Sequence, residues 1–395
     1  MPVRLLKPRL ARWLLWTSIA VHVPIAVAAT FHARLPDYDF DNFYNIATRP
    51  GRPYLDFPVE FPVGTVQVFR ALGSIAGDRG SFGVCLLIVS VIADAAVVAG
   101  LYWGWGAAAA AGYALIVIPL IDLFFLRTDL WSTAFATIAL AAWRRERRIA
   151  AAIGFAAGAA FKLWPLVFLP LLLIPSRVRG RAAPIATAMA GGLAVLGGWL
   201  WVAGPSGLYQ VLTFRGARGW EIESTVGAVW MLIDHSTMRV EAGAWRIGTS
   251  SGPISVLLFV LGGIPTLWMI WRGGRTGHLG AGWAGGLSAL LVLSALLSPQ
   301  YSVWLAPACG VAWVEGDKRI AVLTGIAVFL TNLVWKSFNP LVHGAMVPLG
   351  ILLARNVLLV FLALDAARLV AASHTPAERE QRAEPPVAQV DARPR

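Results

Sequence analysis

The stretch RRERRIAAAIGFAAGAAFKLWPLVFLPLLLIPSRVRGR, residues 144–181, is an apolar run enclosed by two arginine clusters. Cytoplasmic loops of membrane proteins collect Lys and Arg, so both clusters are expected on the same side of a membrane. Residues 149–175 must then enter and leave by one face, which predicts a hairpin of two short helices that turns at Lys162–Pro165. Each arm reaches only ~18 Å at ~1.5 Å per residue, short of a ~30 Å hydrocarbon core, so the turn should lie inside protein or a water-filled cavity. The alternative is a single span.

The composition of the whole chain agrees with a membrane protein. Of its 395 residues, 57% are hydrophobic and only 14% are charged, whereas about 25% are charged in soluble globular proteins. Cys85 and Cys309 both lie in apolar runs, which excludes a disulfide framework or a multi-cysteine zinc site. The net charge of +12 comes from short Lys and Arg clusters between apolar segments. This pattern indicates membrane topology and no nucleic-acid partner.

Other apolar runs are long enough, or nearly so, to cross a bilayer. We place these spans at 13–31, 81–101, 105–121, 130–143, 182–203, 253–271, 279–297, 301–314, 320–335 and 344–370. With the hairpin they predict an all-α fold, a polytopic helix bundle of about twelve membrane segments. The basic clusters then fall on one side, which predicts a multi-pass plasma-membrane protein with both termini cytoplasmic. No small-residue cleavage site follows the first run, so we expect it to remain as the first span.

Polar segments between these spans are expected on the opposite, extracytoplasmic face. They are the long loops 32–80 and 204–252 and the short segments 121–129 and 298–301. A loop of almost 50 residues without its own span is uncommon unless it is functional. Residues 1–372 are therefore expected to form one transmembrane domain with a site on the extracytoplasmic face. The polar, proline-bearing residues 373–395 are expected to be a disordered tail.

Two aspartates follow the first span and are the candidate catalytic residues. Asp39 and Asp41 lie near the membrane interface, where a partly desolvated carboxylate can act as a general base toward a hydroxyl. Residues two apart do not share a helix face, so one base is expected rather than a cooperating pair. Around Asp41, the aromatic residues Phe40, Phe43 and Tyr44 are expected to form a wall for stacking a sugar. The alternative is that both are solvated loop acids.

The segment RPYLDFPVEFP, residues 52–62, should be rigid and extended because its prolines restrict their own angles and those of the residues before them. Such a strip can present Tyr54, Asp56 and Glu60 to a substrate at fixed places. The alternative is a segment that lies in the membrane interface without chemistry. Glu223, in RGWEIES (218–224) of the second long loop, is a further acid that could contact substrate or replace the base.

Charged and polar residues at other segment ends complete the expected site. Arg127 and Asp129 precede the fourth span, and an ion at the membrane is by default a functional hypothesis. A local ion pair or an interfacial anchor is the alternative. Lys162, at the hairpin turn, needs an anion, and a phosphate is a natural partner. Gln300 and Tyr301, placed by a proline at a helix start, could bind a hydroxylated ligand.

Several segments together resemble one family. The blocks DNFYNIATRPGRPYLDFPVEFPVG, LRTDLWSTAFATIALAAWRRERRIAAAIGFAAGAAFKLWPLVFLPLLL, RGWEIES and LSPQYSVWLAP are similar, in this order, to recurring blocks of actinobacterial glycosyltransferase family 87. This family belongs to the C-type glycosyltransferase superfamily and is typified by α-mannosyltransferases that use polyprenyl-phosphate-mannose. The blocks cover residues 36 to 308, most of the chain. The sequence departs from the family at Glu60–Val63, where Glu-Phe-Pro-Val replaces the usual Glu-Tyr-Pro-Pro.

The resemblance implies a C-type fold and an inverting transfer of a sugar, mannose by analogy, from a polyprenyl phosphate to a lipid-linked or cell-envelope glycan. Asp41 best matches the family's catalytic aspartate, and Asp39 is the second choice. Nucleotide sugars are cytoplasmic, so an enzyme on the outer face needs a donor already carried across on a lipid. The phosphate can leave without a general acid when cations such as Lys162 and Arg127 neutralise it. This scheme requires no cofactor or metal, although the extracytoplasmic acids could bind one.

Two other classes of function remain open at this point. A transporter or flippase of lipid-linked sugars would also explain a charged residue such as Lys162 within a hairpin, although the chain shows no internal repeat. A non-catalytic membrane scaffold would leave the buried ions unexplained.

Overall fold

The structure of the chain is a computed structural model. It describes residues 7–32, 38–175, 182–213, 217–234, 238–248 and 252–374. The arginine cluster at 177–181 and all but the first two residues of the expected tail, 373–395, lie outside the described residues. So do residues 1–6 of the N-terminal basic segment.

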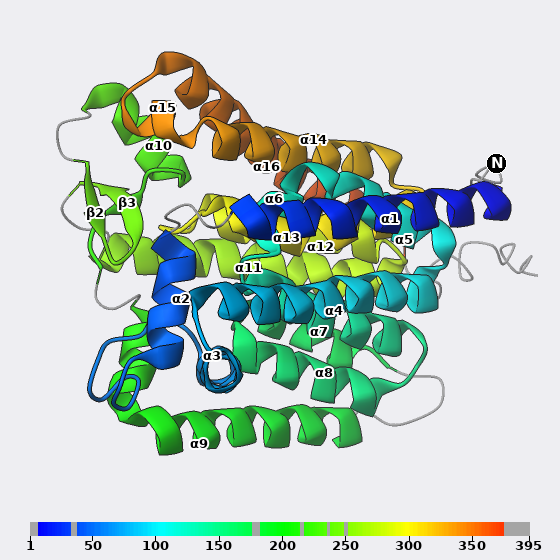
Figure 1. The fold of residues 1–395 in the computed structure, drawn as a ribbon. Helices are drawn as coiled ribbons and strands as arrows, with labels where there is room; N and C mark the ends of the chain where they lie inside the picture. Colours follow the sequence, from blue (N-terminus) through cyan, green and yellow to red (C-terminus); the bar gives the residue numbers. More distant parts are fainter. Residues whose placement is uncertain are drawn as a thin grey trace, which may run out of the picture.

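The chain is a helical bundle whose long helices run side by side (Figure 1). Six described helices are long and apolar enough to cross a membrane. They are α1 (Pro8–His32), α4 (Arg79–Trp105), α9 (Ala182–Leu212), α11 (Gly252–Thr276), α14 (Lys318–Lys336) and α16 (Met346–Ala372). Their length and composition are those of a multi-pass membrane protein.

Shorter helices fill the space between the long ones. They are α5 (Ala107–Ile116), α7 (Asp129–Arg144), α8 (Arg148–Phe161), α12 (Leu279–Val292) and α13 (Ser302–Glu315), with the small turns η1 (Ile118–Leu120), α6 (Ile121–Phe124) and η3 (Pro299–Tyr301). Gly280 of α12 and Gly310 of α13 lie directly against the backbones of Ala312 and Ala109, so a side chain at either glycine would clash. Small residues thus let these helices approach closely, as is usual in membrane bundles.

The predicted break at the hairpin turn is confirmed. Helix α8 ends at Phe161, Lys162 has an extended backbone, and the next segment, η2 (Trp164–Leu173), packs against α8. The second arm is a 3₁₀-helix rather than an α-helix. Its prolines, Pro165 and Pro170, each remove a backbone donor, which disfavours the regular α-helical ladder.

The two long loops are more structured than expected. The first contains α2 (Tyr38–Thr48) and α3 (Val63–Ile75), which lie across the direction of the long helices (Figure 1). The second holds α10 (Thr225–Ile233) and a small antiparallel sheet in the order β1-β3-β2. Its strands are β1 (Trp220–Glu221), β2 (Arg239–Glu241) and β3 (Ala244–Ile247). In the described part of the chain, the regular structure is therefore helical except for this sheet.

Helix α9 also runs further into the second loop than predicted. It bends at Gly204, which adopts a positive φ of 64°, and Pro205 follows inside the helix. A left-handed backbone angle favours glycine, and proline lacks the donor for the preceding turn, so the two residues together account for the bend. The helix continues to Leu212 beyond it.

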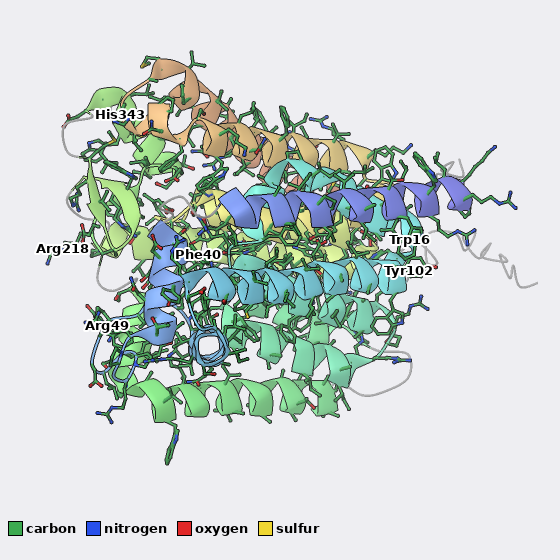
Figure 2. All side chains as sticks on the ribbon, in the orientation of Figure 1. Trp16, Phe40, Arg49, Tyr102, Arg218 and His343 are labelled. Atoms are coloured by element: carbon green, nitrogen blue, oxygen red, sulfur yellow. The ribbon has the colours of Figure 1, made fainter. Side chains whose placement is uncertain are left out.

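The elements segregate between two ends of the bundle. One end, here the loop end, carries α2, the sheet, α10 and the short helix α15 (Phe338–Val342) (Figure 1). Phe40, Arg49, Arg218 and His343 mark this end in Figure 2. At the opposite end, here the basic end, α1 begins and α7 meets α8 at the arginine cluster 144–148. This separation agrees with the expected gathering of the polar loops on one face.

Candidate functional site

Asp39 and Arg127 form an ion pair at the loop end. Asp39 is in the first turn of α2, where a carboxylate favours the positive end of the helix dipole. Its Oδ2 lies 3.0 Å from Nε of Arg127, which comes just before α7. The Arg127 side chain is only 4% exposed, whereas Asp39 keeps 31% of its surface open. The pair therefore combines a fixed cation with an accessible carboxylate.

Asp41 turns to a different partner. Its Oδ1 accepts a hydrogen bond of 2.6 Å from Nε of Arg79, at the start of α4, and the Arg79 guanidinium also lies over the ring of Phe40. Both charged side chains are at least one third exposed. The expectation that Asp39 and Asp41 do not act as a cooperating pair fits these separate contacts.

Asp129 and Lys162 form the most buried of these ion pairs. Lys162 Nζ lies 2.6 Å from Asp129 Oδ1, and the carboxylate is 2% exposed. The same oxygen accepts a hydrogen bond from Nε1 of Trp304. Lys162, for which a phosphate was the expected partner, is paired with a protein carboxylate from the first turn of α7. The alternative of a local ion pair between Arg127 and Asp129 is wrong, because each pairs with a distant segment.

Aromatic residues line one side of Lys162. Its Nζ lies 4.8 Å from the ring centre of Tyr301 and 5.5 Å from that of Trp304. The two rings stack at 4.3 Å, and Trp164 stacks on Trp304 in turn. Such rings attract a cation and hold its position. Tyr301 thus lies in the site as expected, at the start of α13.

Gln300, beside Tyr301, is part of the same helix start. Its Oε1 accepts a hydrogen bond of 2.7 Å from the hydroxyl of Ser298. Pro299 begins the short η3 turn, as predicted, and α13 follows directly. A cavity of about 10 Å³, room for one water, lies against Tyr301, Ser302 and Arg355.

The expected aromatic wall for a sugar is not formed by α2. Phe40 and Phe43 are each 2% exposed and pack against Phe69 and Phe82 inside the protein. Tyr44 is half-buried, with its ring 5.5 Å from that of Phe82. These residues hold α2 onto α3 and α4, so their role is in packing. The prediction failed because it considered α2 without the helices that cover it.

The proline-rich segment is a turn rather than an extended strip. The amide of Tyr54 donates to the carbonyl of Phe57, and that of Asp56 donates to Arg52. Tyr54 has a positive φ of 70°, is buried, and donates from its hydroxyl to the carbonyl of Phe61. Asp56 is exposed and accepts from the amide of Arg52. Both residues therefore shape the turn.

Glu60 lies at the end of this segment and is buried. Its Oε1 accepts a hydrogen bond of 3.0 Å from the side-chain amide of Asn42, which directly follows Asp41 in α2. Burial of Glu60 next to α2 links the segment to the site. The hydrogen bond between Glu60 and Asn42 holds α2 in place, and the Glu60 carboxyl is not presented to solvent.

A cluster of buried acids and arginines lies beside Asp39. Glu221 pairs across the sheet with Arg246, and Arg355 of α16 donates to the carbonyl of Glu223. All four side chains are less than 10% exposed. Burial raises the pKa of Glu221 to about 7, and the negative charge of Asp39 adds to this rise. Burial, and then the charge of Glu221, raises the pKa of the Glu223 carboxyl well above its ordinary value.

A second buried polar group lies within the bundle and was missed. His22 Nδ1 is 3.0 Å from Asp94, whose other oxygen accepts from the hydroxyl of Tyr113. His22 Nε2 lies 2.7 Å from the carbonyl of Ala114. These side chains join α1, α4 and α5. An aspartate inside a long apolar run such as 81–101 is itself a signal, which could have identified Asp94.

The structure thus brings together Asp39, Arg127, Asp129, Lys162, Glu223 and Tyr301 at the loop end, with Asp41 and Gln300 nearby. It assigns Tyr54, Asp56 and Glu60 to the support of α2 and its loop. Arg79, Glu221, Arg246 and Arg355 were not predicted. In comparisons with family models, curated proteins and solved structures, no match was found. The resemblance to glycosyltransferase family 87 stays a prediction from its motifs.

Proposed function

We propose that the protein is a membrane glycosyltransferase of the C-type kind. It moves a sugar, mannose as the first candidate, from a polyprenyl phosphate to a lipid-linked or cell-envelope glycan. The reaction takes place at the loop end, which we assign to the extracytoplasmic side of the plasma membrane, with about twelve membrane segments and both termini on the cytoplasmic side.

One observation supports this function above the others. Asp39, a partly exposed carboxylate, lies where distant parts of the chain meet. It pairs with Arg127, and its negative charge adds to the raised pKa values of Glu221, Glu223 and Tyr301. Charges buried within a membrane protein are costly and are by default functional. A carboxylate held in a polar, aromatic-flanked site is suited to activate a hydroxyl.

The proposed reaction uses Asp39 as the general base. An acceptor hydroxyl gives its proton to the Asp39 carboxylate as its oxygen attacks the anomeric carbon of the donor sugar. The bond between that carbon and the phosphate oxygen breaks, the polyprenyl phosphate keeps the electron pair, and the configuration inverts. We place Asp39 before Asp41 because the charge of Asp39 helps to raise the pKa values of the buried Glu221 and Glu223. Asp41 instead contacts Arg79, which is one third exposed.

The leaving phosphate needs cations, and the site contains several. Lys162 and Arg127 are already paired with carboxylates. A lysine ammonium has three donors and a guanidinium has five, so each can also donate hydrogen bonds to a phosphate. The stacked rings of Tyr301 and Trp304 hold the Lys162 ammonium in position for this phosphate.

The test is transfer by the purified protein. The protein in liposomes is incubated with radiolabelled polyprenyl-phosphate-mannose and a membrane lipid extract, and the products are separated. We expect a new labelled glycan or glycolipid that forms only with the protein present. Absence of any product with donors of several sugars and with the full extract would contradict the proposal.

A transporter of lipid-linked sugars is the second candidate. It is favoured by the buried set of His22, Asp94 and Tyr113, since ionisable residues inside a bundle are typical of transport paths. The same liposomes distinguish the two functions. A transporter would carry labelled donor from one leaflet to the other and leave its chemical form unchanged.

A further inference from the structure

An open apolar groove lies on the outer surface near the basic end of the bundle. It has a volume of about 290 Å³ and is bordered by α5, α13 and α14. Gly112 of α5 and Gly325 of α14 form part of its wall, and Val322, 51% exposed, forms part of the rim. A groove of this kind on a membrane protein faces acyl chains rather than water.

Lys318 lies on the same face of α14 as the groove. It precedes Ala321, Val322 and Gly325 by three, four and seven residues, spacings that place side chains along one helix face. At about 1.5 Å per residue, the groove residues extend about 10 Å from Lys318 along the helix. A charge therefore stands at the end of the groove that is nearer the basic end.

The charged residues on either side of Lys318 have partners elsewhere. Asp317 pairs with His278, and Arg319 pairs with Asp365. Lys318 itself is exposed, with Nζ 5.5 Å from the ring centre of Trp313, a residue that also borders the groove. Tryptophan and lysine together are typical of the headgroup level of a bilayer.

We propose that this groove binds one acyl chain of an anionic phospholipid, whose phosphate contacts Lys318. The apolar walls accommodate the chain, and the ammonium beside Trp313 selects the headgroup. Basic pockets between membrane helices bind anionic headgroups in this way, and each lysine near the surface favours them by an energy that corresponds to about fivefold in affinity. This site is separate from the proposed transfer site at the loop end.

The test counts lipids that stay with the protein. The full chain is placed in nanodiscs with equal amounts of phosphatidylglycerol and phosphatidylethanolamine, released into the gas phase, and analysed by native mass spectrometry. We expect the wild type to retain one phosphatidylglycerol about fivefold more often than phosphatidylethanolamine. Equal retention of both lipids would mean ordinary surrounding lipid and would overturn the proposal.

Two variants separate the groove from the charge. Val322→Trp fills the groove from an exposed position and should abolish the retained lipid, whereas Ile92→Trp, on the exposed face of α4, should not. Lys318→Gln should keep a lipid but lose the preference for phosphatidylglycerol, whereas Lys7→Gln, also exposed, should keep it. The proposal fails if Val322→Trp retains as much lipid as Ile92→Trp. Lys318→Gln leaves the groove walls intact, so it decides the headgroup claim even if Val322→Trp does not fold.

Discussion

The two ends of the bundle treat positive charge differently. At the loop end, Arg127 and Lys162 are largely buried and bound to carboxylates from other segments. At the basic end, only Arg148 of the cluster 144–148 is buried, where it pairs with Glu146. Arg144 and Arg147 are exposed and lie over the rings of Trp105 and Trp103, and Arg144 also pairs with Glu315, whose side chain is 5% exposed. Arginine over tryptophan at a surface is an inexpensive way to anchor a helix in the membrane interface.

The two ends differ in the free energy that is needed to bury their charges, which is larger at the loop end. Removing an ion from water costs several kcal/mol, and a buried pair returns this only with good geometry and further hydrogen bonds. The loop end nevertheless holds three buried acids, with Asp129 2% exposed, Glu221 6% and Glu223 4%. Such a concentration of buried charge is expected where chemistry requires it.

The largest expected effect distinguishes the two aspartates of α2. Asp39→Asn keeps the size of the side chain but cannot accept the proton, so it should reduce turnover by about 10²–10⁴-fold with donor affinity nearly unchanged. Asp41→Asn loses only a contact with a partly exposed arginine and should cost less than about tenfold. Initial rates with labelled donor measure both. A reversed order would make Asp41 the base.

The assignment of the loop end to the extracytoplasmic side predicts which introduced cysteines react from outside the cell. In a background without Cys85 and Cys309, a cysteine at position 56 or 218, both exposed at the loop end, should react with an impermeant thiol reagent added to intact cells. A cysteine at position 147, exposed at the basic end, should not. Position 223 is unsuitable because Glu223 is buried. Labelling of position 147 from outside would show that the basic end, rather than the loop end, is extracytoplasmic.

Breaking the buried ion pair between Asp129 and Lys162 at the loop end should destabilise the fold. Asp129→Ala leaves the Lys162 ammonium and the Trp304 indole without their shared acceptor and should lower the free energy of unfolding by about 3–5 kcal/mol. The double variant Asp129→Ala with Lys162→Met should recover part of this loss, because no unpaired charge remains. Thermal unfolding in detergent measures the cycle. Additive losses would show that the two residues do not interact.

The raised pKa of Glu221 predicts that stability depends on pH. Its pKa rises from 4.5 to about 7 on folding, so between these values the folded state binds more protons than the unfolded state. The free energy of unfolding should therefore be highest below about pH 4.5 and fall as pH rises to about 7, by an amount on the order of 3 kcal/mol. Glu221→Gln should flatten this part of the profile.

Unfolding curves of wild type and Glu221→Gln between pH 5 and pH 8 check this prediction. Glu241→Gln is the matched control: burial raises the pKa of that carboxyl, but hydrogen bonds from Arg218 and Arg239 outweigh burial and hold the pKa below its ordinary value. A wild-type profile that rises toward pH 7 would contradict the sign.

Much of the fold could be predicted because the bilayer imposes simple rules on the sequence. Long apolar runs gave the positions of α4, α11 and α16 to within a few residues, and arginine clusters on both sides of 149–175 gave the break at Lys162. The sheet could not be predicted in the same way. Its strands are only two to four residues long, too short for an alternating pattern.

The site was predicted in its residue types more than in its contacts. Asp39, Arg127, Asp129 and Lys162 were recognised as charges at segment ends, but their pairing depends on which segments pack together. The burial of Phe40 likewise depends on α4. Arg246 and Arg355 are distant in sequence from Glu221 and Glu223, beside which the fold places them, and no local pattern connects them.

The most direct measurement of the central claim is the structure of the protein with the donor bound. A cryo-EM map of the Asp39→Asn protein with polyprenyl-phosphate-mannose would locate the sugar and the phosphate without turnover. We expect the sugar at the loop end, with its anomeric carbon near residue 39 and its phosphate on Arg127 or Lys162. Density for the donor at the basic end, or within the bundle at His22 and Asp94, would contradict the assignment of the loop end as the site of transfer.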